Sequence, residues 1–214
     1  MDDPDAFSNH AVPNTPANHF QGHLLISDQV GAGEVSVVWR ELQRILTTDI
    51  PGDIVEFGCY AGTTSLFIRR LIQRSREFHV YDSFEGLPPK ASQDSSAAGA
   101  DFAAGKLSVS KKEFLRQFAL AKLEPPVIHK GWFKNMADKD MPNEIAFAFL
   151  DGDFYDSILD SLKLVWPRMQ QGGVLLIDDY NRPELPGVQR AVHDFFHGQL
   201  PKLHTEHDIA IIHV

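Results

Sequence analysis

The chain has little cysteine, no excess of basic residues and no long apolar run, and each absence excludes a class of protein. Its 214 residues include a single cysteine, Cys59, so no disulfide can form within the chain and nothing requires an oxidising compartment. Lys and Arg number 20 against 29 Asp and Glu, a net charge of −9, whereas nucleic-acid-binding domains usually present a basic surface. No apolar run approaches the roughly 18 residues of a membrane span. We therefore expect a protein that binds neither nucleic acid nor membrane.

The first residues lack the features of a secretory signal. The opening MDDPDAF is acidic, whereas a signal peptide carries basic residues before an apolar stretch. We therefore expect a cytoplasmic protein. Residues 1–20 are rich in Asp, Asn, Pro and His and show no periodicity. We accordingly expect residues 1–34 to form an N-terminal arm and residues 35–214 to form a single domain.

Short apolar runs alternate with amphipathic segments in the rest of the chain. Helical spacing of apolar residues predicts helices at 35–46, 64–71, 111–123, 156–166 and 188–196. Apolar runs predict strands at 54–57, 78–82, 126–130, 145–151 and 174–179, followed by a terminal hairpin of two short strands. The runs are continuously apolar, as a sheet covered on both faces requires. This alternation predicts an α/β fold with a doubly wound, mostly parallel sheet.

One connection is unusually long. Residues 88–110, between the second predicted strand and the helix at 111–123, are rich in Ala, Ser, Gly and Asp. Connections of this length are often lids over a binding site or disordered insertions, and both interpretations stay open. The composition predicts high mobility in the absence of ligand. A lid would exclude water from a bound substrate.

A glycine-containing turn follows the first predicted strand. The segment VEFGCYAGTTS places Glu56, Gly58 and Gly62 at the end of that strand and the start of a helix. Glycines let the backbone approach a ligand closely, and the first N–H groups of a helix point at it. The spacing does not match G-x-G-x-x-G, the dinucleotide fingerprint. Asp82 ends the next strand, where an acid can accept the hydroxyls of a ribose, so these residues together favour a nucleoside-type cofactor.

Carboxylates also gather at the ends of two later strands. Asp151 and Asp153 follow one strand, and Asp178 and Asp179 follow the next. Ligands of such sheets bind at the carboxyl ends of the strands, and like charges packed there are costly unless a cation joins them. Oxygen-only ligands favour a hard ion such as Mg²⁺. The alternative is that Asp153 or Asp156 caps the next helix, while Asp178 and Asp179 are solvated in a loop.

Six segments, in order along the chain, resemble the macrocin O-methyltransferase family. They are GDIVEFGCYAGTTS, YDSFEGLP, KGWF, LDGDFYDS, LLIDDY and GVQRAVHDFF. The resemblance extends from Pro51 to Phe196. Members of this family are class I S-adenosylmethionine enzymes that methylate sugars of natural products. The resemblance therefore implies a Rossmann-like class I methyltransferase fold with a mostly parallel seven-stranded sheet and helices on both faces.

The resemblance also implies roles for individual residues. It places the methionine portion of S-adenosylmethionine among Glu56, Gly58, Gly62 and Ser65. It assigns the ribose to Asp82 and Ser83, and it places the adenine near Gly131, Trp132 and Phe133. It identifies Asp151, Asp178 and Asp179 as magnesium ligands and Asp153 as the general base.

The implied reaction is methyl transfer to a hydroxyl of a sugar or polyol in a specialised metabolite. Mg²⁺ would lower the pKa of that hydroxyl while a base takes its proton. The expected partners are S-adenosylmethionine, Mg²⁺ and a small hydroxylated acceptor, and a homo-oligomer is neither required nor excluded. Two alternatives stay open. One is a catechol or phenolic O-methyltransferase; the other is a non-catalytic nucleotide-cofactor-binding protein or a dehydrogenase-like enzyme, although the missing fingerprint argues against the dehydrogenase.

Overall fold

The computed structural model describes residues 25–27 and 29–214. Most of the expected N-terminal arm, residues 1–24 and 28, therefore lies outside the described residues. The α-helices of the described part are α2 (Ala32–Thr47), α3 (Thr63–Ile72), α4 (Lys111–Ala121), α5 (Tyr155–Val165) and α6 (Pro186–Phe195). The strands are β1 (Asp53–Phe57), β2 (Phe78–Asp82), β3 (Val127–Lys130), β4 (Ile145–Leu150), β5 (Met169–Ile177), β6 (Leu203–Glu206) and β7 (Ile209–His213).

All of these strands join one sheet in the order β3-β2-β1-β4-β5-β7-β6. The first five strands in that order are parallel, and β7 runs antiparallel to both β5 and β6. The chain adds β2 and β3 on one side of β1 and then adds β4 and β5 on its other side. Because of this reversal, the crossover connections of the two halves place their helices on opposite faces of the sheet. The predicted mostly parallel, seven-stranded sheet and its terminal hairpin are confirmed.

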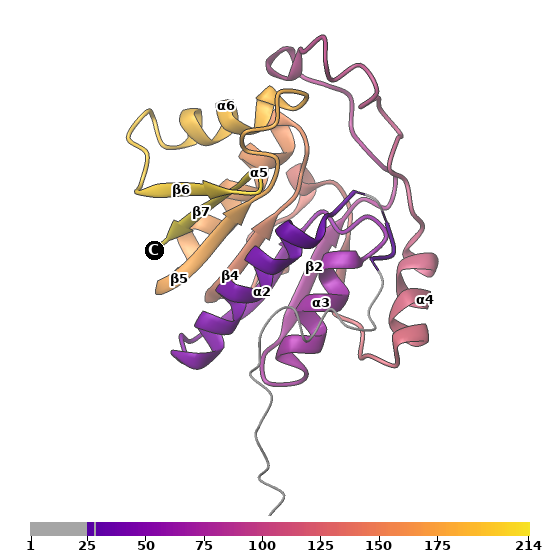
Figure 1. Ribbon diagram of the computed structural model, residues 1–214, viewed down its shortest axis with the longest axis vertical. Helices are drawn as coiled ribbons and strands as arrows, with labels where there is room; N and C mark the ends of the chain where they lie inside the picture. Colours follow the sequence, from indigo (N-terminus) through magenta and orange to yellow (C-terminus); the bar gives the residue numbers. More distant parts are fainter. Residues whose placement is uncertain (1–24, 28) are drawn as a thin grey trace, which may run out of the picture.

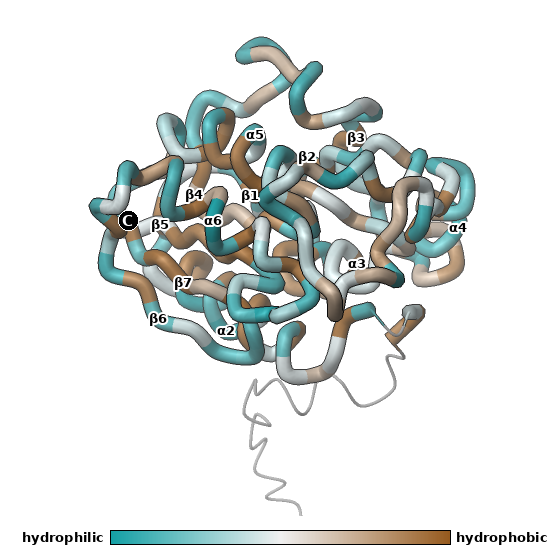
Figure 2. The backbone as a smooth tube through the Cα atoms, turned by 90° about the horizontal axis from the view of Figure 1, so that it is seen from above, coloured by the Kyte–Doolittle hydropathy of each residue, from teal (hydrophilic) through white to brown (hydrophobic). Residues whose placement is uncertain are grey.

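Each face of the sheet has its own apolar core. On one face, Ile54 of β1 and Phe147 of β4 pack with buried residues of α2, α3 and α4. On the other face, Val55 and Ala148 pack with α5 and α6. Successive residues of a strand point to opposite faces, so a strand buried on both sides must be apolar throughout. Figure 1 shows α2 and α3 lying in front of the strands, and Figure 2 shows the hydrophobic stretches of β4 and β5 inside the molecule.

Two local predictions were wrong in detail. Strand β5 begins at Met169, before the expected start at residue 174, because it passes through an irregularity in its pairing with β4. Gly172 adopts a φ of +83° within this irregularity, a conformation that glycine tolerates better than other residues. Asp156 does not cap α5. The helix begins one residue earlier, at Tyr155, and its N-cap residue is Phe154.

The long insertion at residues 88–110 is docked on α5 and α6 (Figure 1). It contains a 3-10 helix, η1 (Ser92–Asp94), and the Asp94 side chain is buried. Asp94 Oδ1 accepts a hydrogen bond of 2.7 Å from the Tyr155 N–H, at the start of α5. Arg190 of α6 donates to the Gln93 carbonyl at 2.6 Å. The insertion therefore supplies the cap that α5 lacks locally, and its mobility without ligand stays a prediction.

Candidate functional site

The sequence-predicted site residues converge on one cavity at the carboxyl ends of β1, β2, β4 and β5. Those that line it are Glu56, Gly58, Asp82, Ser83, Trp132, Phe133, Asp151, Asp153, Asp178 and Asp179. The remaining three, Gly62, Ser65 and Gly131, lie outside this lining. The topology explains the convergence, because parallel strands end at the same edge of a sheet and their following loops face one another.

The turn between β1 and α3 requires glycine at two positions. Gly58 has a φ of +83°, and a Cβ atom there would lie 1.9 Å from the Asp151 carbonyl oxygen. Gly62 has a φ of +95°, and its Cβ would lie 2.9 Å from the Phe114 ring. Side chains at these positions would therefore push the turn away from the β4 end or from α4. Gly58 thus brings the turn close to Asp151, and Thr63 and Thr64 at the start of α3 line the cavity.

Glu56 is buried beneath this turn. Its carboxyl group accepts a short hydrogen bond from the Ser65 hydroxyl. Burial, reinforced by the nearby Asp82 charge and opposed by the Ser65 hydrogen bond, raises the pKa of Glu56 to about 8. Glu56 is therefore mostly protonated at neutral pH when no cationic ligand lies beside it.

Asp82 is held in a fixed orientation at the end of β2. Its Oδ2 accepts hydrogen bonds from the N–H groups of Cys59 at 2.9 Å and Tyr60 at 3.3 Å. Its Oδ1 accepts one from the Phe84 N–H at 2.7 Å. Ser83, the next residue, is buried and also lines the cavity. A carboxylate locked by three backbone donors presents its remaining lone pairs in fixed directions, as recognition of a diol requires.

The aspartates at the ends of β4 and β5 form a tight cluster. Asp151, Asp153 and Asp179 each place a carboxylate oxygen within 4.8 Å of the others. Asp178 is 5% exposed, and its Oδ1 is buried without a hydrogen-bond partner among the described residues. Burial first, and the neighbouring carboxylates second, raise the pKa of Asp151 and Asp178, and the pKa of Asp153 rises to about 8 for the same reasons.

One cation already contacts this cluster. Arg182 donates to Asp179 Oδ1 at 3.0 Å, and its guanidinium lies over the Phe102 ring of the insertion, 5.4 Å from the ring centroid. This pairing lowers the pKa of Asp179 against the larger, opposing effect of burial. Sequence reasoning missed the pairing. The only available signal was the three-residue spacing from Asp179 to Arg182 in the loop after β5.

The donor set fits a hard divalent cation. The cluster offers carboxylate oxygens alone, one of them buried and unpartnered, and a single arginine does not balance four acids. Mg²⁺ is bound by carboxylates and keeps several waters. The structure places Asp153 among the clustered oxygens beside Asp151 and Asp179, whereas the sequence-based ligand set has Asp178 in that position. The division between ligands and base therefore stays a prediction.

Further lining residues come from segments with no motif. Ser27, Gln29 and Val30, which precede α2, line the cavity, as do Phe102 and Leu107 of the insertion. Ser27 hydrogen-bonds to the Thr63 hydroxyl at 3.1 Å, which fixes this segment against the start of α3. The contacts of Ser27, Gln29 and Val30 depend on tertiary structure, so no local pattern in the sequence indicates them. Phe102 and Leu107 belong to the insertion for which a lid was one of the two open interpretations.

Comparisons with known proteins identify the family of the chain. Residues 27–208 match the family described as macrocin-O-methyltransferase (TylF). A tetracenomycin-type 4'-O-methyltransferase of Streptomyces olivaceus, whose full name specifies a dimethoxyrhamnosyl substrate, is 32% identical over 72% of this chain. Mycinamicin III 3''-O-methyltransferase of Micromonospora griseorubida is 30% identical over 78% of this chain and 68% of its own length. This chain spans 61% of the length of the Streptomyces olivaceus relative.

Solved structures show the same fold. The O-methyltransferase NovP superposes with a TM-score of 0.75 at 26% identity, covering 86% of this chain and 80% of its own. The calicheamicin methyltransferase CalS11 superposes with a TM-score of 0.70 at 19% identity, covering 84% of this chain and 78% of its own. In the part of this chain that the structure describes, no helix is long and apolar enough to cross a membrane.

Proposed function

The chain belongs to the macrocin-O-methyltransferase family, and from this premise we propose that it is an S-adenosylmethionine- and Mg²⁺-dependent O-methyltransferase. Its acceptor is a hydroxyl on a sugar or polyol of a specialised metabolite. The observation that carries the proposal is one cavity lined both by the glycine-containing turn after β1 and by the cluster of aspartates at the ends of β4 and β5. The Streptomyces olivaceus relative supports the acceptor class, since its name specifies 4'-O-methylation of a compound that carries a dimethoxyrhamnosyl group.

The cofactor is assigned to the β1 and β2 side of the cavity. Glu56, buried beside the start of α3, is placed to meet the cationic methionine portion, whose positive charge would lower the pKa of this carboxyl group. Gly58 and Gly62 let the turn approach the ligand, and Ser65 holds Glu56. Asp82 and Ser83 are assigned to the ribose, while Gly131, Trp132 and Phe133 are assigned to the adenine end.

The aspartate cluster is assigned to hydroxyl activation. Asp151, Asp178 and Asp179 would hold Mg²⁺, which when bound supplies a positive charge that lowers the pKa of an acceptor hydroxyl. Asp153 takes the hydroxyl proton on a carboxylate oxygen. Burial raises the pKa of this group to about 8 when no cation lies beside it, and a bound cation would lower that pKa towards the ionised form that a base requires. S-adenosylmethionine bound on the β1 and β2 side would supply the methyl group: the O–CH₃ bond would form as the S–CH₃ bond breaks, and the thioether of S-adenosylhomocysteine would be the leaving group.

Arg182 and the insertion are assigned to the acceptor side. Arg182 bridges Asp179 and Phe102, so an acceptor that reaches the aspartates must lie against this pair. Phe102 and Leu107 of the docked insertion line that side of the cavity, where they would limit the access of water to a bound acceptor.

Isothermal titration tests the cofactor assignment. We expect heat of binding from S-adenosylhomocysteine and none from NAD, because the β1–α3 turn lacks the dinucleotide fingerprint. A methylation assay with glycosylated natural products and with catechol, each with and without EDTA, then tests the reaction. Binding of NAD alone would overturn the cofactor assignment, and methylation of catechol but no glycoside would overturn the acceptor class.

A further inference from the structure

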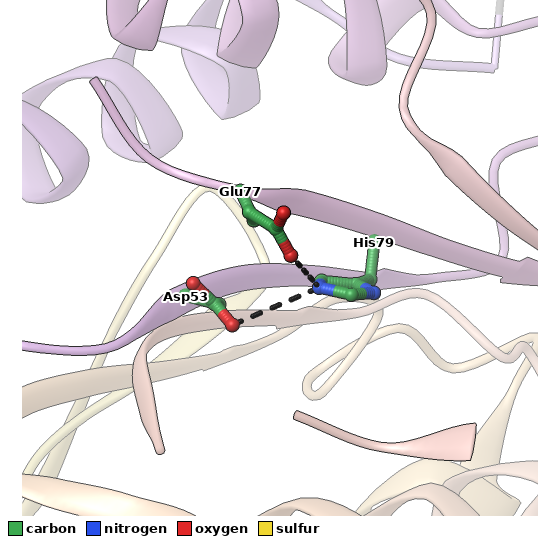
Figure 3. A group of neighbouring side chains, drawn as sticks. All are labelled: Asp53, Glu77 and His79. Carbon is green, nitrogen blue, oxygen red and sulfur yellow. Dashed lines mark ion pairs between the residues drawn. The ribbon is translucent and has the colours of Figure 1, made fainter. Parts of the chain in front are cut away.

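A second cluster of metal-binding side chain types lies at the opposite end of the sheet, where the parallel strands begin. Asp53 is the first residue of β1, Glu77 immediately precedes β2, and His79 is the second residue of β2. The parallel register pairs Val55 with His79, and residues two apart along a strand face the same side. All three side chains therefore share one face, and Figure 3 shows both carboxylates directed at the imidazole.

The imidazole faces two acids without making a hydrogen bond to either. His79 Nε2 lies 3.7 Å from Asp53 Oδ2 and 3.5 Å from Glu77 Oε2. His79 is 9% exposed, and its Nε2 is buried without a hydrogen-bond partner among the described residues. An unpartnered buried nitrogen between two carboxylates is costly unless a further atom joins the three groups.

The other ring nitrogen of His79 is already engaged. Its Nδ1 lies 3.1 Å from His129 Nε2 on β3, and the two rings stack at 5.4 Å between centroids. A His79 ring that donates from Nδ1 to His129 presents the Nε2 lone pair to the two acids. Metal-binding histidines characteristically use their second nitrogen in such an orienting hydrogen bond.

No neighbouring side chain takes the place of a cation here. Arg76 lies close in the sequence, but it donates to Asp49 at 2.7 Å and to the Gly52 carbonyl at 3.3 Å. In the described ranges, the ion pairs of Asp53 and Glu77 are those to His79 alone. The site therefore carries two carboxylates and one imidazole with an open direction towards solvent, because Glu77 is 72% exposed.

We propose that Asp53, Glu77 and His79 bind a divalent transition-metal ion, with Zn²⁺ as the occupant that the donor set fits best. The three candidate ligand atoms all lie within 4.8 Å of one another. Zinc–ligand bonds of about 2.0–2.2 Å in a tetrahedral site place neighbouring ligand atoms roughly 3.4 Å apart. The observed separations of 3.5 and 3.7 Å from His79 Nε2 are close to that spacing.

The chemistry of the ligands distinguishes this site from the aspartate cluster. One imidazole nitrogen and two carboxylate oxygens suit zinc, whereas carboxylates alone suit magnesium. Water completes the coordination on the exposed side. The bound ion would join the first residues of β1 and β2. It would therefore stabilise the amino-terminal ends of these strands, at the opposite end of the sheet from the cavity. This proposal is independent of the methyltransferase assignment.

Equilibrium dialysis of the full chain against Zn²⁺ tests the proposal. The titration contains excess Mg²⁺, so that the aspartate cluster does not compete for zinc. We expect one Zn²⁺ per chain, with an affinity that falls at least tenfold in Glu77→Gln. Glu124→Gln is the matched control, because Glu124 is an exposed glutamate before β3 whose carboxylate pairs with Arg74 and not with this site. The control should bind within twofold of the unaltered chain.

Cobalt supplies an independent readout of the ligands. Co²⁺ bound at this site should give the visible absorption of a four-coordinate ion, and His79→Ala should abolish it. Should His79→Ala fail to fold, Glu77→Gln decides the matter, because the exposed Glu77 side chain contributes little to packing. The absence of stoichiometric zinc in the unaltered chain would overturn the proposal. Zinc affinity unchanged in both Glu77→Gln and Asp53→Asn would overturn it equally.

Discussion

The two ends of the same parallel sheet both gather carboxylates, but they do so in different surroundings. At the carboxyl end, Asp178 and Asp179 are each 5% exposed and lie in a cluster of acids. At the amino end, Glu77 is 72% exposed and shares its site with an imidazole. Buried like charges perturb one another strongly, whereas exposed ones are screened. This contrast is consistent with the proposed catalytic role of the carboxyl end and with the proposed structural zinc site at the amino end.

Among the changes considered, removal of the proposed Mg²⁺ from the aspartate cluster should reduce activity the most. We expect EDTA to abolish methyl transfer and Mg²⁺ to restore it, because hydroxyl activation depends on the ion. Asp178→Asn should weaken Mg²⁺ affinity, so excess Mg²⁺ should partly restore its activity. A methylation assay over a Mg²⁺ titration measures both effects. Full activity in EDTA would contradict the metal assignment, while Glu77→Gln serves as the control that leaves activity unchanged.

The Asp153→Asn variant distinguishes the proposed general base from the proposed metal ligands of that cluster. Asp153→Asn is isosteric but cannot accept the hydroxyl proton, so kcat should fall on the order of 10² to 10⁴ fold. Binding of S-adenosylhomocysteine should stay unchanged, and added Mg²⁺ should not restore activity. Steady-state kinetics over a Mg²⁺ series checks this. Restoration of activity by added Mg²⁺ would instead identify Asp153 as a metal ligand. The structure allows this outcome, because an Asp153 oxygen lies within 4.8 Å of oxygens of Asp151 and Asp179.

Substitution of Asp82, at the end of β2, tests the proposed cofactor site. Asp82→Ala removes the carboxylate assigned to the ribose, and we expect S-adenosylhomocysteine affinity to fall at least tenfold, about 1.4 kcal/mol. Titration calorimetry measures the change. Because Asp82 also accepts hydrogen bonds from the β1–α3 turn, Asp82→Asn is a useful companion that keeps the side-chain volume. An unaltered dissociation constant in both variants would remove Asp82 from the binding site.

Substitution of Glu56 should be visible as a change in the pH dependence of stability. Its pKa is about 8 in the folded chain against an ordinary value of 4.5. The folded state therefore holds this proton more tightly than the unfolded state, so its contribution to stability is complete below pH 4.5 and is lost as pH rises through 8. Glu56→Gln cannot lose a proton, so its stability should decline less over that range.

Urea unfolding in chelator at several pH values measures this difference. The exposed Glu144→Gln variant is the control and should follow the unaltered chain. The aspartate pKa values are also raised, so the decline should be reduced in Glu56→Gln rather than eliminated. Parallel pH curves for Glu56→Gln and the unaltered chain would contradict a buried, protonated Glu56.

The sequence was sufficient to predict the sheet, its covered faces and the edge at which the acids meet. Continuous apolar runs such as IAFAFL of β4 indicate burial on both faces, and the carboxyl ends of such strands define the ligand edge. Local patterns did not indicate the Arg182–Asp179 pair or the cavity contacts of Ser27. The His79 cluster was likewise invisible, because Asp53 and Glu77 meet only through the register of β1 and β2. Contacts that depend on tertiary structure leave no periodic signal.

The capping of α5 by Asp94 has a consequence for engineering. The helix start that follows Asp153 is held by a residue of the insertion, and the neighbouring Gly187 has no room for a side chain, since a Cβ there would lie 1.7 Å from Asp94 Oδ1. The insertion is thus attached at a point separate from the residues, Phe102 and Leu107, that line the cavity. A designer could therefore replace the cavity-lining part of residues 88–110 to alter the cavity, while retaining Asp94 and Gly187 as a fixed attachment beside the start of α5.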